Sequence, residues 1–383
     1  MTTRIGIDYT AAVHQTAGIG RYTRELVNSI AALTEKSAKP YFHLFVAAAR
    51  CSELPLPGSN FEWRSTRLSE RWLARLWYRL RLPLPVQHWL GSLDLFHAPD
   101  FILPPVRPGT PTIVTIHDLS FVREPDSTMP GMSVHLNKWV PHSVKRADRV
   151  IAVSEATRRD LIEFYQTPPA KISVIYHGVS PEFRPVQEKE RLRAVRYKYG
   201  LDQRPFILSV GTIQPRKNYQ RLVQAFASIN QPLSLVIAGS EGWNCDDVYR
   251  EVERLGLDDR VYFPGFVAEE DLPVLLSAAT LFGYPSLYEG FGLPVLEAMA
   301  CGTPIVAANQ SSLPEVVGDA GLTVDPTDVA ALATAITRLL DDPSLRERLS
   351  AAGLAQAAKF TWPTTAAQLL RVYQEVIEES QAK

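Results

Sequence analysis

The chain has 383 residues, 46% of them hydrophobic, and a formal net charge of −1. Its length suits two domains better than one, and its balanced charge excludes a general electrostatic attraction for nucleic acid. The three cysteines lie too far apart in sequence for a disulfide framework or a zinc motif, which predicts a reducing compartment (Cys51, Cys245 and Cys301). There is no signal-peptide pattern and no apolar run of about 18 residues, so we expect a cytoplasmic protein without a membrane span.

Apolar runs typical of buried strands alternate with helical patterns in the first half of the chain. Helices are predicted at Arg21–Leu33 and Glu155–Tyr165. Strands are predicted at Ile5–Tyr9, Phe42–Ala47, Leu93–His97, Thr112–His117, Arg149–Val153 and Ile172–Tyr176. This alternation is the pattern of βαβ units with a parallel sheet.

The alternation stops between His177 and Pro205, where prolines and a charged stretch occur, and then resumes. The second series predicts strands at Pro205–Val210, Leu233–Ala238, Val261–Phe263, Ala279–Pro285 and Pro304–Ala308, and helices at Tyr219–Ile229, Asp246–Leu255, Glu269–Ala278 and Pro294–Ala300. We therefore predict an α/β protein with a Rossmann-like, doubly wound domain at 1–185, a connection at 186–204, a second such domain at 205–361 and a C-terminal helix at 362–383.

A pair of carboxylates marks the strongest candidate site. Glu289 belongs to a loop that leaves a predicted strand, and Glu297 to the first turns of the helix that Pro294 opens. Open α/β sheets bind ligands at such strand ends. Backbone N–H groups at the helix start can face an anion, while the carboxylates accept hydrogen bonds from sugar hydroxyls (Gly290, Phe291, Gly292 and Leu293). The alternative for Glu297 is a carboxylate that stabilises the helix N-terminus, and both roles can coexist.

Two basic residues, Arg216 and Lys217, follow the first strand of the second series and precede a helix with Asn218 at its start. Cations are unfavourable at a helix N-terminus, which argues against a merely solvated pair. They can instead neutralise a diphosphate and lower the cost of its departure as an anion.

The first domain offers two further candidates. Gly18 and Gly20 follow the first strand and allow close backbone approach to a ligand, although a turn explains them equally well. His117 ends a predicted strand beside Asp118, where it can hydrogen-bond a sugar hydroxyl or support charge at a reacting carbon; the alternative is a buried histidine of the core.

Five segments together resemble a known family. In chain order they are Ala17–Tyr22, Val114–Leu119, Val150–Glu155, Gly211–Asn218 and Tyr288–Glu297, the last carrying an E-x7-E spacing. They resemble the motifs of retaining GT-B glycosyltransferases of family 4 in their usual order. Within that family, His117-Asp118, the loop at Pro215–Asn218 and Gly239–Trp243 look most like bacterial mannosyltransferases of O-antigen or exopolysaccharide assembly.

The resemblance implies two domains that face a cleft, with the C-terminal helix returning to the N-terminal, acceptor-binding domain. The C-terminal domain would bind a nucleotide-diphosphate sugar, with Lys217 on the diphosphate, Glu289 on the hexose and Glu297 on the ribose. Some relatives carry an arginine just after the loop's leading glycine, Gly211. Thr212 stands there in this chain, which leaves open whether Arg216 substitutes.

The remaining candidates also come from the resemblance. The donor site would include Gly18, Gly20, Gly211 and the base-reading backbone of Gly265, Phe266 and Val267. His97, Asp100 and Asp118 are candidates to face the acceptor, with a structural role equally open for His97 and Asp100.

The implied activity is a retaining, metal-independent hexosyl transfer, with GDP-mannose as the expected donor and a saccharide or lipid-linked saccharide as acceptor. No D-x-D motif occurs, so neither a metal nor another cofactor is expected. The alternatives are a UDP- or dTDP-sugar donor and a non-catalytic nucleotide-sugar-binding subunit. A phosphorylase and a dehydrogenase are disfavoured, since neither a pyridoxal phosphate lysine nor a complete G-x-G-x-x-G is evident.

Residues 63–89 could contact a membrane. Arg71, Arg75 and Arg79 share one predicted helical face, with apolar residues around them (Trp72, Leu73, Leu76, Trp77 and Leu80). A basic, tryptophan-bearing helix can lie on an anionic bilayer, which would place the protein peripherally at the inner face of the plasma membrane. An ordinary solvated helix is an equally good explanation.

Overall fold

The structure, a computed structural model, describes residues 3–15, 18–37, 39–47, 55–127, 129–201 and 204–382. Ala17 and Cys51 therefore lie outside the described residues. The chain forms two compact units. The N-terminal unit comprises Met1–Leu119, Gly131–Gly178 and Thr361–Lys383, and the C-terminal unit comprises Ser120–Pro130 and Val179–Phe360.

The N-terminal unit is built on a seven-stranded sheet, counted over its described residues, in the order β3-β2-β1-β4-β5-β6-β7. All its pairings are parallel. Its strands are β1 (Arg4–Asp8), β2 (Tyr41–Ala47), β3 (Phe61–Thr66), β4 (Leu95–Ala98), β5 (Thr112–Ile116), β6 (Arg149–Ala152) and β7 (Ile172–Val174). Its helices are α1 (Thr10–His14), α2 (Ile19–Thr34), α3 (Glu70–Ala74), α4 (Gln87–Leu90), α6 (Pro130–Arg146), α7 (Glu155–Tyr165) and α16 (Trp362–Gln381).

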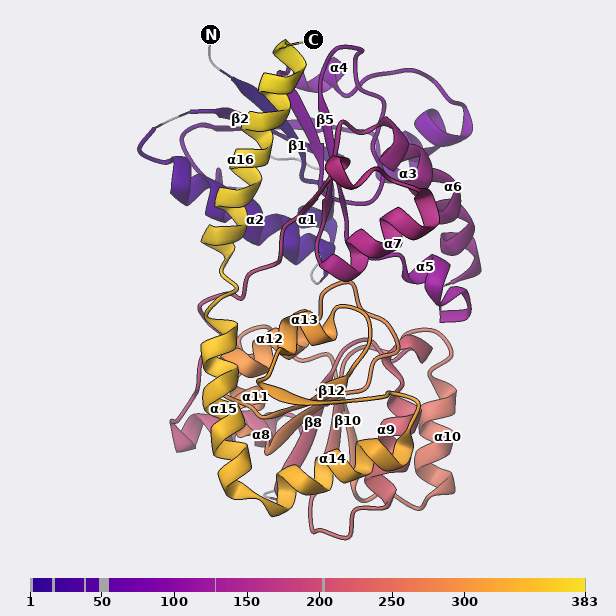
Figure 1. Cartoon of the computed structure of the whole chain (residues 1–383), viewed down its shortest axis with the longest axis vertical. Coiled ribbons are helices and arrows are strands. Elements are labelled where there is room, and N and C mark those ends of the chain that lie inside the picture. The colour runs from indigo at the N-terminus through magenta and orange to yellow at the C-terminus, as the bar shows by residue number, and fades with distance from the viewer. Residues whose placement is uncertain are drawn as a thin grey trace. The chain divides into compact units, whose positions relative to one another are not determined.

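The C-terminal helix α16 belongs to the N-terminal unit, as the sequence predicted. It packs along α2 (Figure 1). Its apolar face, which includes Trp362, Leu369 and Tyr373, joins the core formed by α2 and the first strands. Burial of this face removes large aromatic and aliphatic surfaces from water, which is what holds the last helix of the chain against its first unit.

The C-terminal unit has a six-stranded sheet, again counted over described residues, in the order β10-β9-β8-β11-β12-β13. All its pairings are parallel. Its strands are β8 (Phe206–Val210), β9 (Ser234–Ala238), β10 (Val261–Gly265), β11 (Leu281–Tyr284), β12 (Ile305–Ala308) and β13 (Gly321–Val324). Its helices are α5 (Ser120–Arg123), α8 (Lys189–Lys198), α9 (Tyr219–Ala227), α10 (Asp246–Arg254), α11 (Leu272–Ala278), α12 (Leu293–Ala300), α13 (Leu313–Val317), α14 (Val329–Asp341) and α15 (Pro343–Ala357).

Both sheets are doubly wound, and every predicted strand is present within a few residues of its predicted bounds. The chain order reverses between β1 and β4 in one sheet and between β8 and β11 in the other. These two switch points place the carboxyl ends of neighbouring strands where open α/β sheets bind ligands.

Two edge strands and one long helix are among the elements that were not predicted. The edge strand β3 contains Glu62 and Arg64, so it lacks the apolar run of a central strand. The edge strand β13 is four residues long and begins with glycine. Helix α6 is polar and holds Pro141 inside it, which obscures a helical pattern.

None of the helices in the described part of the chain is long and apolar enough to span a bilayer.

Candidate functional site

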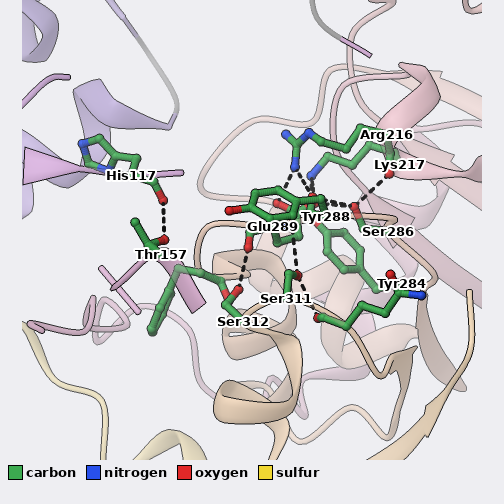
Figure 2. A network of polar contacts seen from close by, with 12 residues as sticks. His117, Thr157, Arg216, Lys217, Tyr284, Ser286, Tyr288, Glu289, Ser311 and Ser312 are labelled. Carbon is green, nitrogen blue, oxygen red and sulfur yellow. Dashed lines mark hydrogen bonds and ion pairs between the residues drawn. The ribbon is translucent and has the colours of Figure 1, made fainter. Parts of the chain in front are cut away.

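The C-terminal unit gathers its predicted basic and acidic side chains at the β8/β11 switch point. Arg216 and Lys217 lie in a 3-10 turn (Pro215–Lys217) after β8. Glu289 lies in the loop between β11 and α12. Arg216 Nη1 lies 3.0 Å from Glu289 Oε2, and Lys217 Nζ lies 2.7 Å from Oε1. One carboxylate therefore holds both cations, each through a different oxygen (Figure 2).

Two hydroxyl groups complete the contacts of this carboxylate. Ser286 donates to Glu289 Oε1 at 2.6 Å, and Tyr284 donates to the same oxygen at 3.1 Å (Figure 2). Lys217 Nζ also donates to the Tyr284 hydroxyl at 2.5 Å. Neither Tyr284 nor Ser286 was singled out from the sequence. Tyr284 resembles the other apolar residues of a buried strand, and Ser286 resembles an ordinary residue at the end of that strand.

The charge state of Glu289 follows from these neighbours. Burial raises the pKa of a carboxyl group, but Arg216 and then Lys217 outweigh it and lower the pKa of Glu289 to about 2. Glu289 is 7% exposed, so its ion pairs with the two cations lie in a poorly solvated setting. At neutral pH this cluster contains one negative and two positive groups, which leaves a net positive charge to attract an anion.

The loop that carries Glu289 is fixed by two serines. Glu289 N–H donates to Ser311 Oγ at 3.0 Å, and Ser312 Oγ donates to the carbonyls of Glu289 and Phe291 at 3.0 and 2.8 Å (Figure 2). Gly292 then enters α12 with a φ of 104°, a left-handed conformation that favours glycine.

The predicted residues at the start of α12 lie together in this turn. Gly290 and Phe291 lead through Gly292 into Leu293, the first residue of α12, and Glu297 follows on the same helix with 3% of its surface exposed. The other predicted donor residues lie at the ends of β8 and β10 (Gly211, Gly265, Phe266 and Val267). Among them, the Phe266 side chain is 59% exposed and Val267 is buried.

Close glycine packing joins the loops after β8 and β9. A Cβ on Gly239 would lie 2.1 Å from the carbonyl oxygen of Gly211, which is backbone and cannot rotate away. Gly211 N–H in turn donates to the Ala238 carbonyl at 2.8 Å. Gly239 therefore allows the loop that carries Arg216 and Lys217 to lie directly against its neighbour.

We expect Gly239→Ala to displace this loop, reduce thermal stability by more than about 1 kcal/mol and weaken nucleotide-sugar binding. Gly256→Ala is a matched control, because Gly256 also has a positive φ, of 63°, but has no atom within 4 Å of a Cβ. Differential scanning fluorimetry with and without a nucleotide diphosphate measures both effects. Equal losses in the two variants would show that only backbone strain matters.

In the N-terminal unit, His117 directly follows β5 and is 8% exposed. Its Nε2 lies 2.8 Å from the Pro99 carbonyl oxygen. A carbonyl only accepts, so Nε2 carries the proton and Nδ1 of the neutral ring is an acceptor. Burial lowers the pKa of His117, which favours the neutral ring. The Thr157 hydroxyl donates to the His117 carbonyl at 3.4 Å (Figure 2).

The three candidate acceptor residues occupy different settings. Asp100 is half-buried after β4, where burial first, and the carboxylates of Asp8 and Glu70 next, raise its pKa to about 7. Asp118 is half-buried beside His117. His97 is fully buried and both of its ring nitrogens have hydrogen-bond partners, which favours the structural role over contact with an acceptor.

Gly18 and Gly20, the two glycines of the first loop, differ in the space around them. A Cβ on Gly20 would lie 2.1 Å from the Gln15 carbonyl, so packing of α2 against the preceding turn alone accounts for Gly20. Gly18 has a φ of 59° and no atom within 4 Å of a Cβ, so this position is open. Of the pair, Gly18 is the residue that has room for a ligand.

Comparison with known proteins assigns the family. The pattern of the family described as "Glycosyltransferase Family 4" matches residues 16–183, and that of "Glycosyl transferases group 1" matches residues 193–356. The chain is 34% identical over 369 residues to the O-antigen chain mannosyltransferase B of Escherichia coli, covering 93% of this chain and 95% of that protein.

Solved structures show the same fold. Sucrose-phosphate synthase from Thermosynechococcus elongatus matches with a TM-score of 0.76 and 24% identity over 98% of this chain and 100% of that chain. Anabaena HepE in complex with UDP and glucose matches with a TM-score of 0.73 and 20% identity, with the same coverage. The two parallel, doubly wound sheets agree with the homology, which extends over almost the whole length of the chain. This chain therefore belongs to the family 4 glycosyltransferases.

Proposed function

We propose that the chain transfers a hexose with retention of its anomeric configuration, from GDP-mannose to a saccharide or lipid-linked saccharide acceptor in cell-surface polysaccharide synthesis. The observation that carries this proposal is the Arg216–Glu289–Lys217 cluster at a strand-end switch point, next to the start of α12. The cluster has the charges that a sugar diphosphate requires: two cations for the phosphates and one carboxylate for the hexose hydroxyls.

Donor binding changes the partners within this cluster. When a diphosphate arrives, Arg216 and Lys217 turn part of their hydrogen bonds toward its oxygens, and Glu289 is released to accept from hexose hydroxyls. The cations then stabilise the negative charge that develops as the sugar leaves, an electrostatic contribution of the kind that dominates many transfer reactions. Glu297 on α12 holds the ribose, and the backbone at Gly265–Val267 contacts the base.

The N-terminal unit supplies His117 and the acceptor residues. The Nδ1 lone pair of the neutral His117 ring accepts a hydrogen bond from a sugar hydroxyl, because Nε2–H is already engaged with Pro99. Asp100 and Asp118 are the candidates to face the acceptor. No role as general base is assigned to His117.

Metal independence is part of the proposal. Arg216 and Lys217 already provide the positive charge that a divalent ion would bring to a diphosphate. The mannosyl donor rests on the name of the Escherichia coli relative. The HepE complex with UDP and glucose favours a uridine donor as the second candidate.

Turnover by the purified chain tests the function. GDP-mannose, UDP-glucose and a dTDP-sugar are supplied separately with a metal chelator and a mannose-terminated oligosaccharide acceptor, and released nucleotide and product are measured. The proposal expects selective release of GDP and an α-linked product by NMR. Selective use of a UDP- or dTDP-sugar would replace the donor. Binding without turnover on acceptors of several types would support a non-catalytic subunit instead.

We also propose that a basic surface of the N-terminal unit contacts anionic lipid. Arg71, Arg75 and Arg79 are all exposed, as are three apolar neighbours (Trp72, Leu80 and Leu82, at 54, 62 and 45%). Leu73 and Trp77, two of the apolar residues expected around the arginines, are buried in the unit's core, at 3 and 7% exposure. The helix switches at Arg75–Arg79 from α to π geometry, which changes the direction of its side chains.

Charge reversal tests this surface. The triple variant Arg71→Glu, Arg75→Glu, Arg79→Glu should weaken binding to phosphatidylglycerol vesicles by at least about a hundredfold, since each basic residue near such a surface contributes about 1 kcal/mol. The control carries the same change on exposed helices of the C-terminal unit, at Arg193, Arg250 and Arg348. Equal vesicle co-sedimentation by the first variant and the wild type would exclude the contact.

A further inference from the structure

A buried chain of hydrogen bonds connects the C-terminal helix with the strand ends beside His117. Tyr373 Oη on α16 lies 2.6 Å from His97 Nδ1 on β4, and His97 Nε2 lies 2.8 Å from Thr115 Oγ1 on β5. Thr115 lies on β5 two residues before His117. All three side chains are 1% exposed or less, so the chain runs through the core of the N-terminal unit.

The proton positions along this chain are mutually consistent. Burial lowers the pKa of His97 to about 3, so the ring is neutral and has one donor and one acceptor nitrogen. One ring nitrogen donates and the other accepts, and the hydroxyl groups of Tyr373 and Thr115 can each take either role. Each link therefore has one donor and one acceptor.

The two strands that this chain joins end beside the residues that hold His117. Pro99, whose carbonyl accepts from His117 Nε2, lies two residues beyond His97, and His117 itself lies two residues beyond Thr115. The Tyr22 ring packs against the His117 ring at 4.8 Å between centroids and 84°, an edge-to-face contact. The His97–Thr115 hydrogen bond therefore joins the two strand ends that set the direction of the His117 Nδ1 lone pair.

We infer that the Tyr373–His97–Thr115 chain positions His117 for the transfer reaction, an inference that rests on the proposed function. In this role α16 does more than fill the core, because a hydroxyl group at its middle orients a side chain at the strand ends. His97 and Tyr373 are then positioning residues that act through Pro99 and Thr115 and touch neither donor nor acceptor.

Two substitutions at Thr115 separate the hydrogen bond from packing. Thr115→Val keeps the shape of the side chain but removes the hydroxyl, whereas Thr115→Ser keeps the hydroxyl and removes a methyl group. We expect Thr115→Val to lower kcat about tenfold to a hundredfold with an unchanged KM for the donor, and Thr115→Ser to retain most of kcat. A larger loss of kcat in Thr115→Ser than in Thr115→Val would overturn the inference.

Two further measurements keep the test decisive. Val376→Ala removes core packing from α16 but leaves the hydrogen-bond chain intact. If its kcat were as low as that of Thr115→Val at matched thermal stability, the loss of activity would come from weaker docking of α16 and not from the lost hydrogen bond. The ring ¹⁵N resonances of His117, assigned with His117→Gln, report its orientation without any activity. They should shift in Thr115→Val and not in Thr115→Ser. Unchanged resonances would refute the positioning even if the wild type turned over no donor, whereas absence of turnover alone would count only against the proposed function.

Discussion

Replacing Glu289 with glutamine is expected to abolish most of the activity and to destabilise the C-terminal unit at the same time. The amide keeps the shape of the carboxylate but leaves Arg216 and Lys217 without their shared counter-charge. Removing one partner from a buried ion pair typically costs about 3–5 kcal/mol. In the proposed function Glu289 contacts the reacting sugar, so loss of its charge should lower kcat/KM by about 10² to 10³.

The pH dependence of this stabilisation has a definite sign. The folded-state pKa of Glu289 is lowered from 4.5 to about 2, so its contribution is fully present above the unfolded value of about 4.5 and is lost as pH falls through about 2. The difference in thermal stability between the wild type and Glu289→Gln should therefore be constant from pH 7 to about 5 and should shrink in more acidic solution.

A second buried carboxylate provides the control for Glu289. Glu251 on α10 is 5% exposed and accepts from Arg254 at 2.7 Å and from Gln224 at 2.6 Å. Glu251→Gln should cost stability but leave kcat/KM close to that of the wild type. In addition, a nucleotide diphosphate should raise the melting temperature of Glu289→Gln, because its charge replaces the missing carboxylate. Glu289→Gln with full activity would contradict the assignment of the donor site.

Replacing Lys217 with methionine is the second change with a large expected effect. Methionine keeps most of the length of the side chain but provides no charge for the diphosphate. Donor affinity should fall, and kcat/KM should drop by about 10² to 10³, because a preorganised cation stabilises most strongly the negative charge that develops on the departing diphosphate. Lys217→Arg should restore little, since Lys217 Nζ fits between Tyr284 and Glu289 as a single point of positive charge.

The matched control for Lys217 is another lysine–carboxylate pair of the same unit. Lys198 Nζ on α8 lies 2.6 Å from Asp271 Oδ2 and is exposed. Lys198→Met removes a comparable contact outside the cluster and should leave turnover unchanged. Steady-state kinetics at several donor concentrations separates the loss of affinity from the loss of kcat. A Lys217→Met variant with wild-type kinetics would exclude the diphosphate role.

The main parts of the proposed donor site could be predicted from the sequence because they are local. Glu289 and Glu297 share one segment, and Arg216 and Lys217 share another. Each segment follows a strand with a clear apolar run, so the parallel-sheet rule alone brings the two strand ends together. The observed ion pairs between Glu289 and the two cations agree with that expectation.

The rest of the site depends on contacts between distant segments, which periodicity cannot predict. Tyr284 and Ser286 reach Glu289 only through the conformation of the loop after β11. His97 meets Tyr373 across 276 positions, so its structural setting required knowledge of where α16 docks. Trp77, one of the apolar residues expected around the arginines of residues 63–89, is buried, and the π-helical turn at Arg75–Arg79 has no signal in the helical spacing.

The most direct test of the central claim is isothermal titration of the purified wild-type chain with GDP-mannose in the presence of a metal chelator, alongside UDP-glucose and a dTDP-sugar. The account predicts saturable binding of GDP-mannose at one site per chain, weaker binding of the other donors, and loss of the heat signal in Lys217→Met. Absence of binding for every nucleotide sugar, or binding that appears only when a divalent metal is restored, would contradict it.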